Sequence, residues 1–168
     1  MNQDHDVPET KSPKPKLSAY DQAAKLLGGR AHFRRQLFDK LARRGYHSDE
    51  IESALNRLTE QGYLDDAKLA LHVATDRATR GGEGARRVRA ELAKRGADSG
   101  VIEEAVSGAI PTDDREAALE TARRFLARGA APKRDMLARY LDRKGFSQRA
   151  ILRALRELEP DLEASEET

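Results

Sequence analysis

The chain has 168 residues and a formal net charge of +2, and it is 38% hydrophobic, 36% charged and only 5% aromatic. It contains no Cys, which excludes disulfide bonds and thiolate metal sites and fits a reducing compartment. The polar N-terminus differs from a secretory signal, and no apolar run reaches the ~20 residues that span a bilayer. We therefore expect a soluble cytoplasmic protein with a thin aliphatic core that is rich in helix formers.

Charge is distributed unevenly along the chain. The last ten residues hold five acids and no Lys or Arg, so the preceding 158 residues carry a net charge of +7. A basic body of this kind suits contact with phosphate or with an acidic protein surface. The alternative explanation is a solvated surface that only keeps the chain in solution.

Apolar residues recur at three- and four-residue spacing, the period of an α-helix, and no sustained alternation or hairpin turn indicates a strand. Pro111 and Pro132 are expected to interrupt or begin helices. Asp65 and Asp113 are placed to cap helix starts, and the Gly-rich run 80–85 separates the fourth helix from the fifth. We predict helices near 18–28, 31–44, 48–61, 65–80, 84–95, 99–108, 113–128, 132–144 and 148–158.

One pattern occurs three times around Gly45, Gly96 and Gly145. Leu or Val stands eight residues before each glycine and Leu four before it, while Ile stands six after, Ala nine after, and Leu or Val ten after. A match at so many offsets is a repeat. Each glycine is predicted to close a helix in the left-handed conformation, where it carries no Cβ penalty. The residues predicted to cap the helix that follows are His47-Ser48, Asp98 and Ser147.

A single repeat unit has little core of its own, so we expect the units to support one another by stacking. The predicted fold is all-α, an elongated, curved array of three tandem three-helix modules built from helix-turn-helix-like repeats. Both ends of the chain are too polar to offset their ordering entropy and are predicted to be disordered. The predicted segments are a tail at 1–16, modules at 17–63, 64–110 and 112–158, and an acidic tail at 159–168.

A basic pair stands immediately before each of the three glycines. Cations at a helix C-terminus interact favourably with the helix dipole, which is worth about 0.3–1 kcal/mol each. We assign the second member of each pair to this structural role, while the first member can serve either the dipole or a partner. The pairs are Arg43-Arg44, Lys94-Arg95 and Arg143-Lys144.

Other basic residues have no such structural explanation. On the last predicted helix, Arg149, Arg153 and Arg156 form one stripe opposite the apolar positions. Like charges at this spacing repel, so an anionic partner would relieve a cost built into the helix. The candidate face for contact with a partner or with DNA comprises Arg86, Arg89, Lys94, Arg139, Arg143, Arg149, Arg153 and Arg156.

The sequence carries no motif that supports catalysis. The four His residues are scattered without metal-ligand spacing, and the Gly-rich run lacks the preceding strand and the lysine-hydroxyl ending of a phosphate loop. Most aromatic residues stand at predicted core positions, which argues against base stacking. We expect a protein that is not an enzyme and that takes no cofactor, metal or small-molecule ligand.

Three segments carry a family resemblance, and together they span the chain from about Ala19 to Leu158. They read "LLGGRAHFRRQLFDKLARRGY", "LTEQGYLDDAKLA" and "LARYLDRKGFSQRAI". In this order and spacing they resemble the RecX family of regulatory proteins, which are bacterial modulators of the RecA recombinase. The resemblance implies three tandem three-helix modules, the arrangement that the periodicity indicates independently.

The resemblance also implies a partner. Proteins of this family bind RecA, lie in the groove of its filament on DNA, and reduce its recombinase, ATPase and co-protease activities. This chain is therefore expected to act in DNA repair, homologous recombination and control of the SOS response.

Two alternatives remain open. The first is a tandem helix-turn-helix protein that binds DNA. Acidic residues such as Glu52, Glu103 and Glu104 on the second helices of two repeats disfavour direct base readout, while weak, salt-sensitive DNA contact fits the basic body. The second alternative is a passive helical scaffold with another partner.

Overall fold

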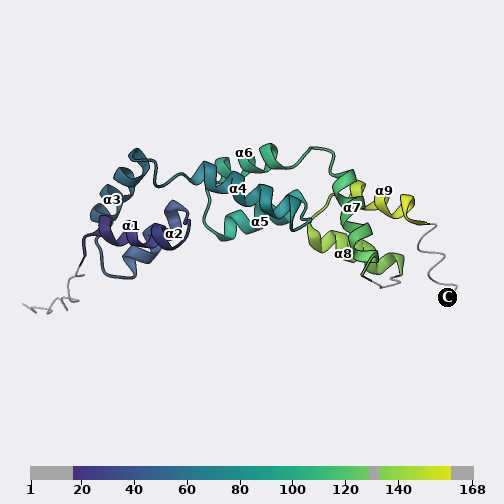
Figure 1. Ribbon diagram of the computed structural model, residues 1–168, viewed down its shortest axis with the longest axis horizontal. Helices are drawn as coiled ribbons and strands as arrows, with labels where there is room; N and C mark the ends of the chain where they lie inside the picture. The colour runs from purple at the N-terminus through teal and green to yellow at the C-terminus, as the bar shows by residue number, and fades with distance from the viewer. Residues whose placement is uncertain (1–16, 129–132, 160–168) are drawn as a thin grey trace, which may run out of the picture. The chain divides into compact units, whose positions relative to one another are not determined.

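The computed structural model describes residues 17–128 and 133–159, and every regular element in these ranges is an α-helix (Figure 1). The predicted all-α class is confirmed, and each helix begins and ends within three residues of its predicted bounds. Pro132 and both predicted tails, apart from Glu159, lie outside the described residues. The helices are α1 Ala19–Gly29, α2 Arg34–Ala42, α3 Ser48–Glu60, α4 Asp66–Thr79, α5 Ala85–Lys94, α6 Ser99–Ala109, α7 Arg115–Leu126, α8 Arg134–Lys144 and α9 Gln148–Glu157.

These helices pack mainly in three consecutive sets of three, because each helix makes its closest contacts with the other two helices of its set. The chain divides into two compact units, the first ending at Asp65 and the second beginning at Asp66. The first unit contains α1–α3, and the second contains both α4–α6 and α7–α9. None of the described helices is long and apolar enough to cross a membrane.

The core of the first unit is made of the repeat positions identified in the sequence. Leu37, Leu41 and Ile51 have no exposed side-chain surface, and Leu64 closes the core after α3. Tyr46, which follows the glycine, is also buried, and its hydroxyl donates to the carbonyl of Leu17 at 2.8 Å. The residue after the glycine therefore packs back onto the helices around it.

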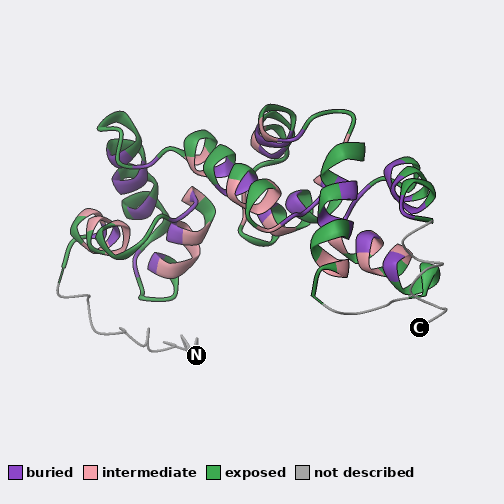
Figure 2. Ribbon diagram, turned by 45° about the vertical axis from the view of Figure 1, so that its right-hand side comes forward, coloured by how far each residue is buried: buried purple, intermediate pink, exposed green. Residues whose placement is uncertain are grey.

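The second unit buries the equivalent positions twice, once in each set of helices. Figure 2 shows the buried residues along one side of each helix, as expected for helices that share a core with their neighbours. The apolar stripe of the repeat is thus used in the same way three times along the chain. The buried equivalents are Val88, Leu92, Ile102, Ala105 and Val106 on α5–α6, and Leu137, Leu141, Ile151, Ala154 and Leu155 on α8–α9.

The predicted left-handed glycines are confirmed, with φ angles of 86°, 84° and 88° at Gly45, Gly96 and Gly145. At each turn, the N–H of the residue after the glycine donates to the carbonyl five residues earlier, at 3.4, 3.1 and 3.3 Å. Together with the bond from the glycine N–H, this makes the Schellman closure of a helix end. Gly62, with φ of 74°, closes α3 in the same way, although the repeat pattern did not indicate it.

Two predicted N-caps are confirmed, because the carboxylate of Asp98 and the hydroxyl of Ser147 accept backbone N–H groups at 2.9 and 3.2 Å. Asp113 accepts the N–H of Arg115 at 3.2 Å, but the N-cap residue of α7 is Asp114. In the first copy His47 is the N-cap residue, and its own N–H donates to the carboxylate of Glu50 at 3.1 Å. The start of α3 is therefore satisfied by a carboxylate in the helix rather than by the side chain of Ser48.

Substituting two of the equivalent glycines separates backbone strain from steric clash. A Cβ at Gly45 meets open space, so Gly45→Ala is expected to cost only the left-handed strain, about 1 kcal/mol. A Cβ at Gly145 would lie 2.5 Å from the backbone nitrogen of Arg87, so Gly145→Ala is expected to cost more. Native-state hydrogen exchange, measured peptide by peptide, reports the stability of each unit separately. Gly45→Asn serves as a milder control, and equal losses at the two glycines would contradict this account.

The stability of the first unit is expected to fall in mild acid because of His32. This side chain is only 4% exposed, and burial, followed by the charges of Arg30 and Lys40, lowers its pKa below the ordinary value. The unfolded chain therefore binds a proton more readily than the folded one, and stability is lost as pH falls below about 6.5 towards the folded pKa.

Hydrogen exchange of the first unit between pH 7.5 and 5.5 tests this expectation. His32→Gln should flatten the dependence on pH even if it lowers stability at every pH. The control His72→Gln, which changes an exposed histidine of the second unit, should leave the dependence intact. An unchanged slope in His32→Gln would assign the effect to other groups.

Candidate partner-binding surface

Helix α9 separates apolar and basic side chains cleanly. Its inner side lies in the core shared with α7 and α8, where Ile151 and Leu155 are 3% and 4% exposed. Its other side presents three exposed arginines and Leu152, which is 50% exposed. Residues at this spacing are neighbours on one side of a helix. We call this surface the α9 outer face, and it consists of Arg149, Leu152, Arg153 and Arg156.

The arginines of the α9 outer face have no partner among the described residues. Within 17–128 and 133–159, none of the three makes an ion pair or a side-chain hydrogen bond. The one acid on α9 is Glu157, against three arginines. The predicted stripe is thus present, exposed and uncompensated by the part of the chain that the structure describes.

On the first two sets of helices, the acid at the position equivalent to Leu152 has an internal partner. Glu52 on α3 and Glu103 on α6 stand at the repeat position that Leu152 occupies on α9. Each pairs with an arginine of the preceding helix, because Arg34 contacts Glu52 and Arg89 contacts Glu103. Among the residues described here, only the third set has an apolar residue at this position, with exposed arginines beside it.

The pairing of Arg89 with Glu103 is bidentate. The guanidinium donates to the carboxylate through Nε at 2.8 and 3.1 Å and through Nη2 at 3.0 Å. These hydrogen bonds lower the pKa of Glu103 and raise the pKa of Arg89 relative to their ordinary values. The charge of Arg89 is thus engaged within its own set of helices.

The eight candidate basic residues divide into two groups. Arg86 donates to the carboxylate of Asp142 on α8 at 2.8 Å, and Arg89 binds Glu103, so both have internal partners. The other six are exposed, and their side chains have no partner within the described ranges. Five of these six stand on α8 or α9, which concentrates the free cations on the third set of helices. The six are Lys94, Arg139, Arg143, Arg149, Arg153 and Arg156.

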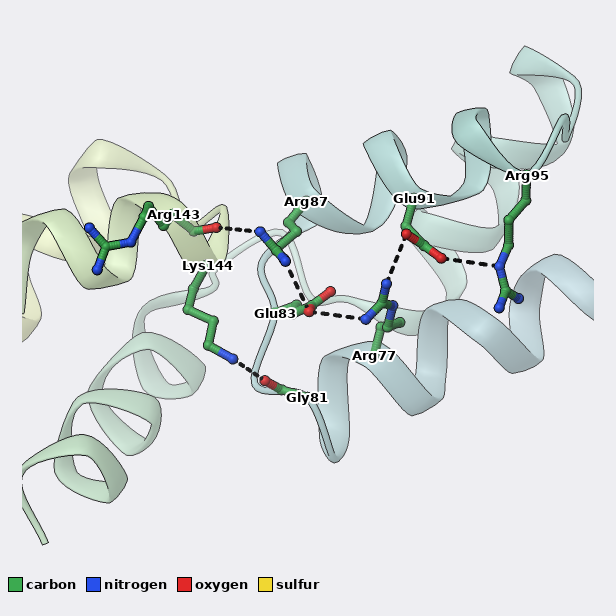
Figure 3. A network of polar contacts seen from close by, with 8 residues as sticks. All are labelled: Arg77, Gly81, Glu83, Arg87, Glu91, Arg95, Arg143 and Lys144. Carbon is green, nitrogen blue, oxygen red and sulfur yellow. Dashed lines mark hydrogen bonds and ion pairs between the residues drawn. The ribbon is translucent and has the colours of Figure 1, made fainter. Parts of the chain in front are cut away.

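The basic pairs before the three glycines divide in a similar way. The second members are engaged: Arg44 donates to the carbonyl of Lys40 at 2.9 Å, and Arg95 pairs with Glu91 at 3.1 Å. Lys144 donates to the carbonyl of Gly81 at 2.7 Å (Figure 3). The first members have no side-chain partner in the described residues, so they are the ones that remain available to a binding partner.

The segment Gly81–Gly84, which we call the connector, does more than join α4 to α5. Glu83 is 7% exposed, and its Oε1 accepts from Arg77 at 3.3 Å and from Arg87 at 3.1 Å (Figure 3). The N–H of Gly84 donates to the carbonyl of Lys144 at 2.8 Å. The sequence predicted a connector here but not its contact with α8. The available signal was a single glutamate among closely spaced glycines.

The connector and the start of α5 satisfy the end of α8. The last carbonyls of a helix lack partners within the helix and attract cations. Arg87 donates to the carbonyl of Arg143 at 3.2 Å, and Arg86 contacts the carbonyl of Asp142. Figure 3 shows the guanidinium of Arg143 directed away from this contact. The contact therefore holds α8, and with it α9, against the second set of helices.

Glycine is required on both sides of this contact. A Cβ at Gly84 would lie 2.4 Å from the carbonyl oxygen of Gly145, and a Cβ at Gly145 would lie 2.5 Å from the backbone nitrogen of Arg87. Asp114 adds a second link within the third set, accepting from the N–H and the hydroxyl of Ser147 at 2.9 and 2.7 Å. The start of α9 is thus held by two contacts, the connector against Gly145 and Asp114 against Ser147.

The exposed charged groups of the third set differ from a metal site. Among the described residues, no group of three or more His, Asp or Glu side chains is placed to hold a metal ion. The free groups that gather on the surface are arginines, which bind anions and carboxylates rather than react with them. The surface is therefore suited to recognition.

Comparison with known proteins agrees with the fold and identifies the family. Residues 19–58 match the family model described as "RecX, first three-helix domain", and residues 65–106 match "RecX, second three-helix domain". The chain is 36% identical over 136 residues to the Regulatory protein RecX of Chlorobaculum tepidum, covering 81% of this chain and 85% of that protein. The chain belongs to the RecX family.

Further RecX relatives cover more of the chain. The Regulatory protein RecX of Xanthomonas oryzae pv. oryzae is 36% identical over 162 residues, which is 93% of this chain and 98% of that protein. The crystal structure of RecX from Lactobacillus salivarius matches with a TM-score of 0.74, covering 84% of this chain and 94% of that chain. At 22% sequence identity, this structure supports the RecX fold alone.

Removing the buried carboxylate of the connector should destabilise the second unit. Glu83→Ala leaves Arg87 without its acid and removes two charge-assisted hydrogen bonds, so the expected loss is about 1.5–3 kcal/mol. Urea denaturation combined with peptide-resolved hydrogen exchange measures this loss. The matched control Glu120→Ala breaks an exposed pair with Arg124 and should change stability little. If both variants lose the same amount, the connector does not hold the third set in place.

Proposed function

We propose that this chain is a non-enzymatic cytoplasmic regulator of the RecA recombinase. It binds RecA and the RecA–DNA filament, in the filament groove, and lowers recombinase, ATPase and co-protease activity. The observation that carries this proposal is membership of the RecX family, whose relatives are named as regulatory proteins. The partner follows from the family resemblance, and the surface chemistry of the chain is compatible with it.

The contact that we propose is centred on the α9 outer face. Three exposed arginines, with no partner among the described residues, surround an exposed leucine and so combine charge recognition with a small apolar surface, the composition typical of protein interfaces. Lys94, Arg139 and Arg143 extend the set of free cations. Because Arg86 and Arg89 have internal partners, we assign them a structural role in this proposal.

Repetition along the chain suits a polymeric partner. We propose that segments 17–63, 64–110 and 112–158 act as three modules that engage neighbouring filament subunits. When weak contacts are linked on one chain, each later contact forms at a high effective concentration, so total affinity exceeds that of any single contact. Bridging of this kind would hinder filament growth or the conformational cycle that accompanies ATP hydrolysis.

Direct DNA binding is a distinguishable outcome. The free arginines can also contact phosphate, and such contact weakens steeply with salt and is insensitive to sequence. Titration of fluorescently labelled DNA with and without RecA separates the possibilities. Binding that depends on the filament supports the regulator. Tight sequence-specific binding without RecA would support a transcription factor, and no binding in either case would support a scaffold with another partner.

Neutralising the α9 outer face should impair inhibition without unfolding the protein. The variant Arg149→Gln/Arg153→Gln/Arg156→Gln should require at least about tenfold more protein to inhibit the filament ATPase. The reason is that each lost contact contributes roughly 0.5–1 kcal/mol. Thermal melting should stay close to that of the unmodified chain, because these side chains have no partner in the described residues.

A charge-matched control distinguishes this surface from net charge. Arg35→Gln/Arg80→Gln/Arg124→Gln removes the same three charges from exposed arginines that pair with acids one helical turn away. This control should inhibit as well as the unmodified protein. Equal loss in both triple variants would show that only total charge matters, and a large drop in melting temperature for the α9 variant would show that its arginines are structural.

A further inference from the structure

The α9 outer face has the features of an occupied surface but no occupant among the described residues. Leu152 is 50% exposed; Arg153 follows it directly, and Arg149 and Arg156 stand one helical turn before and after it. The equivalent faces of α3 and α6 carry a glutamate at this position together with an arginine that neutralises it. The third set has no glutamate at this position, so an acid for its arginines would have to come from another segment.

Such a segment follows α9 directly in the sequence. Residues 159–168 read "EPDLEASEET" and contain five acids and no Lys or Arg. Leu162 stands between Asp161 and Glu163, so the segment repeats the order of the α9 outer face with the opposite charge. We infer that the acidic segment 159–168 binds the α9 outer face and competes there with an anionic partner.

The length of the segment is sufficient for this contact. The helix ends at Glu157, and Pro160 stands two residues after the C-cap Leu158, where proline disfavours continuation of a helix. Nine residues beyond Glu159 reach up to about 30 Å when extended. The three arginines extend over about 10 Å along the helix axis, at 1.5 Å per residue. A segment that turns back after α9 can therefore pass all three arginines.

The same covalent link makes a weak contact effective. A short linker gives an effective concentration in the millimolar range, so a contact of millimolar affinity is already well populated. Exposed ion pairs of this kind are weak and screened by salt. A partner that binds through several sites can displace the segment, which therefore tunes binding rather than abolishes it.

A spin label tests the contact without any partner. The chain has no cysteine, so Ser165→Cys provides one unique labelling site in the full-length protein. At low ionic strength we expect strong paramagnetic broadening of amide signals along Arg149–Arg156 in ¹⁵N-labelled protein. Broadening should disappear at about 0.5 M salt, where the screening length falls to a few ångströms. Broadening limited to residues next to 159 in the chain would overturn the inference.

Two variants show whether charge complementarity causes the broadening. It should be lost in Arg149→Gln/Arg153→Gln/Arg156→Gln and in Asp161→Asn/Glu163→Gln/Glu166→Gln/Glu167→Gln. It should persist in the control Asp76→Asn/Glu60→Gln/Glu104→Gln/Glu120→Gln, which removes the same number of charges from α4, α3, α6 and α7. Persistence in the first two variants would overturn the inference. So would broadening in a mixture of ¹⁵N-labelled protein without cysteine and unlabelled spin-labelled protein, because the segment would then bind a second copy.

The competition, unlike the contact, rests on the proposed function. The variant with the neutralised segment should inhibit filament ATPase at severalfold lower concentration than the unmodified chain, while the control variant should not differ. If the contact is detected and the inhibition curves coincide, the competition is wrong. If the unmodified protein fails to inhibit RecA at all, the proposed function fails, while the spin-label result still decides whether the segment binds α9.

Discussion

The left-handed glycine at the end of each middle helix is the constraint on which the rest of this structure depends. It closes the helix through the same two backbone hydrogen bonds in all three copies, and it turns the chain so that the leucines before it face the isoleucine after it. Gly145 also has a second role. Because it has no side chain, the backbone of the connector at Gly84 can approach it closely. One residue thus ends a helix, closes a core and joins two sets of helices. This explains why the end of α8 collects hydrogen bonds from Arg86, Arg87 and Gly84.

Several charged side chains of the described residues join one helix to another, whereas the arginines of the α9 outer face have no partner there. With 36% charged residues and a thin core, the chain uses arginines to join elements that apolar contacts alone hold weakly. The series Arg87, Glu83, Arg77, Glu91 and Arg95 alternates in sign and ties α4 to α5 through the connector (Figure 3). The arginines of α9 differ from these residues because no acid among the described residues pairs with them. An exposed arginine alone is weak evidence of function, but a stripe of three on one helix, where the equivalent positions of α3 and α6 include an internally paired glutamate, is stronger.

Features set by residues close in the sequence could be predicted from it, and contacts between residues far apart in the sequence could not. Helix periods, side-chain caps and the conformation of Gly145 are set by residues within one or two turns, so the pattern of the repeat was sufficient. The bond between Arg86 and Asp142 joins residues 56 positions apart, and no local pattern indicates it. The sequence therefore placed Arg86 and Arg89 in the candidate face, while the structure gives both of them acid partners. The stripe on α9 was predictable because its evidence, period and charge, lies within a single helix.

The repeat itself suggests why an unpaired face can persist. In the first two sets, the glutamate seven residues after the glycine pairs with an arginine of the preceding helix. In the third set, that position is Leu152 and the cations stand on the last helix. Exposed like charges cost only a few tenths of a kcal/mol per pair, so this exchange costs the fold little stability. Under the proposed contact, the segment 159–168 supplies the acids that Glu52 and Glu103 supply elsewhere, but through a connection that a partner can reverse. The pairs of Glu52 and Glu103 and the proposed pairs of segment 159–168 then differ in one respect. In the first case the carboxylate belongs to a helix, and in the second it belongs to the segment after the last helix.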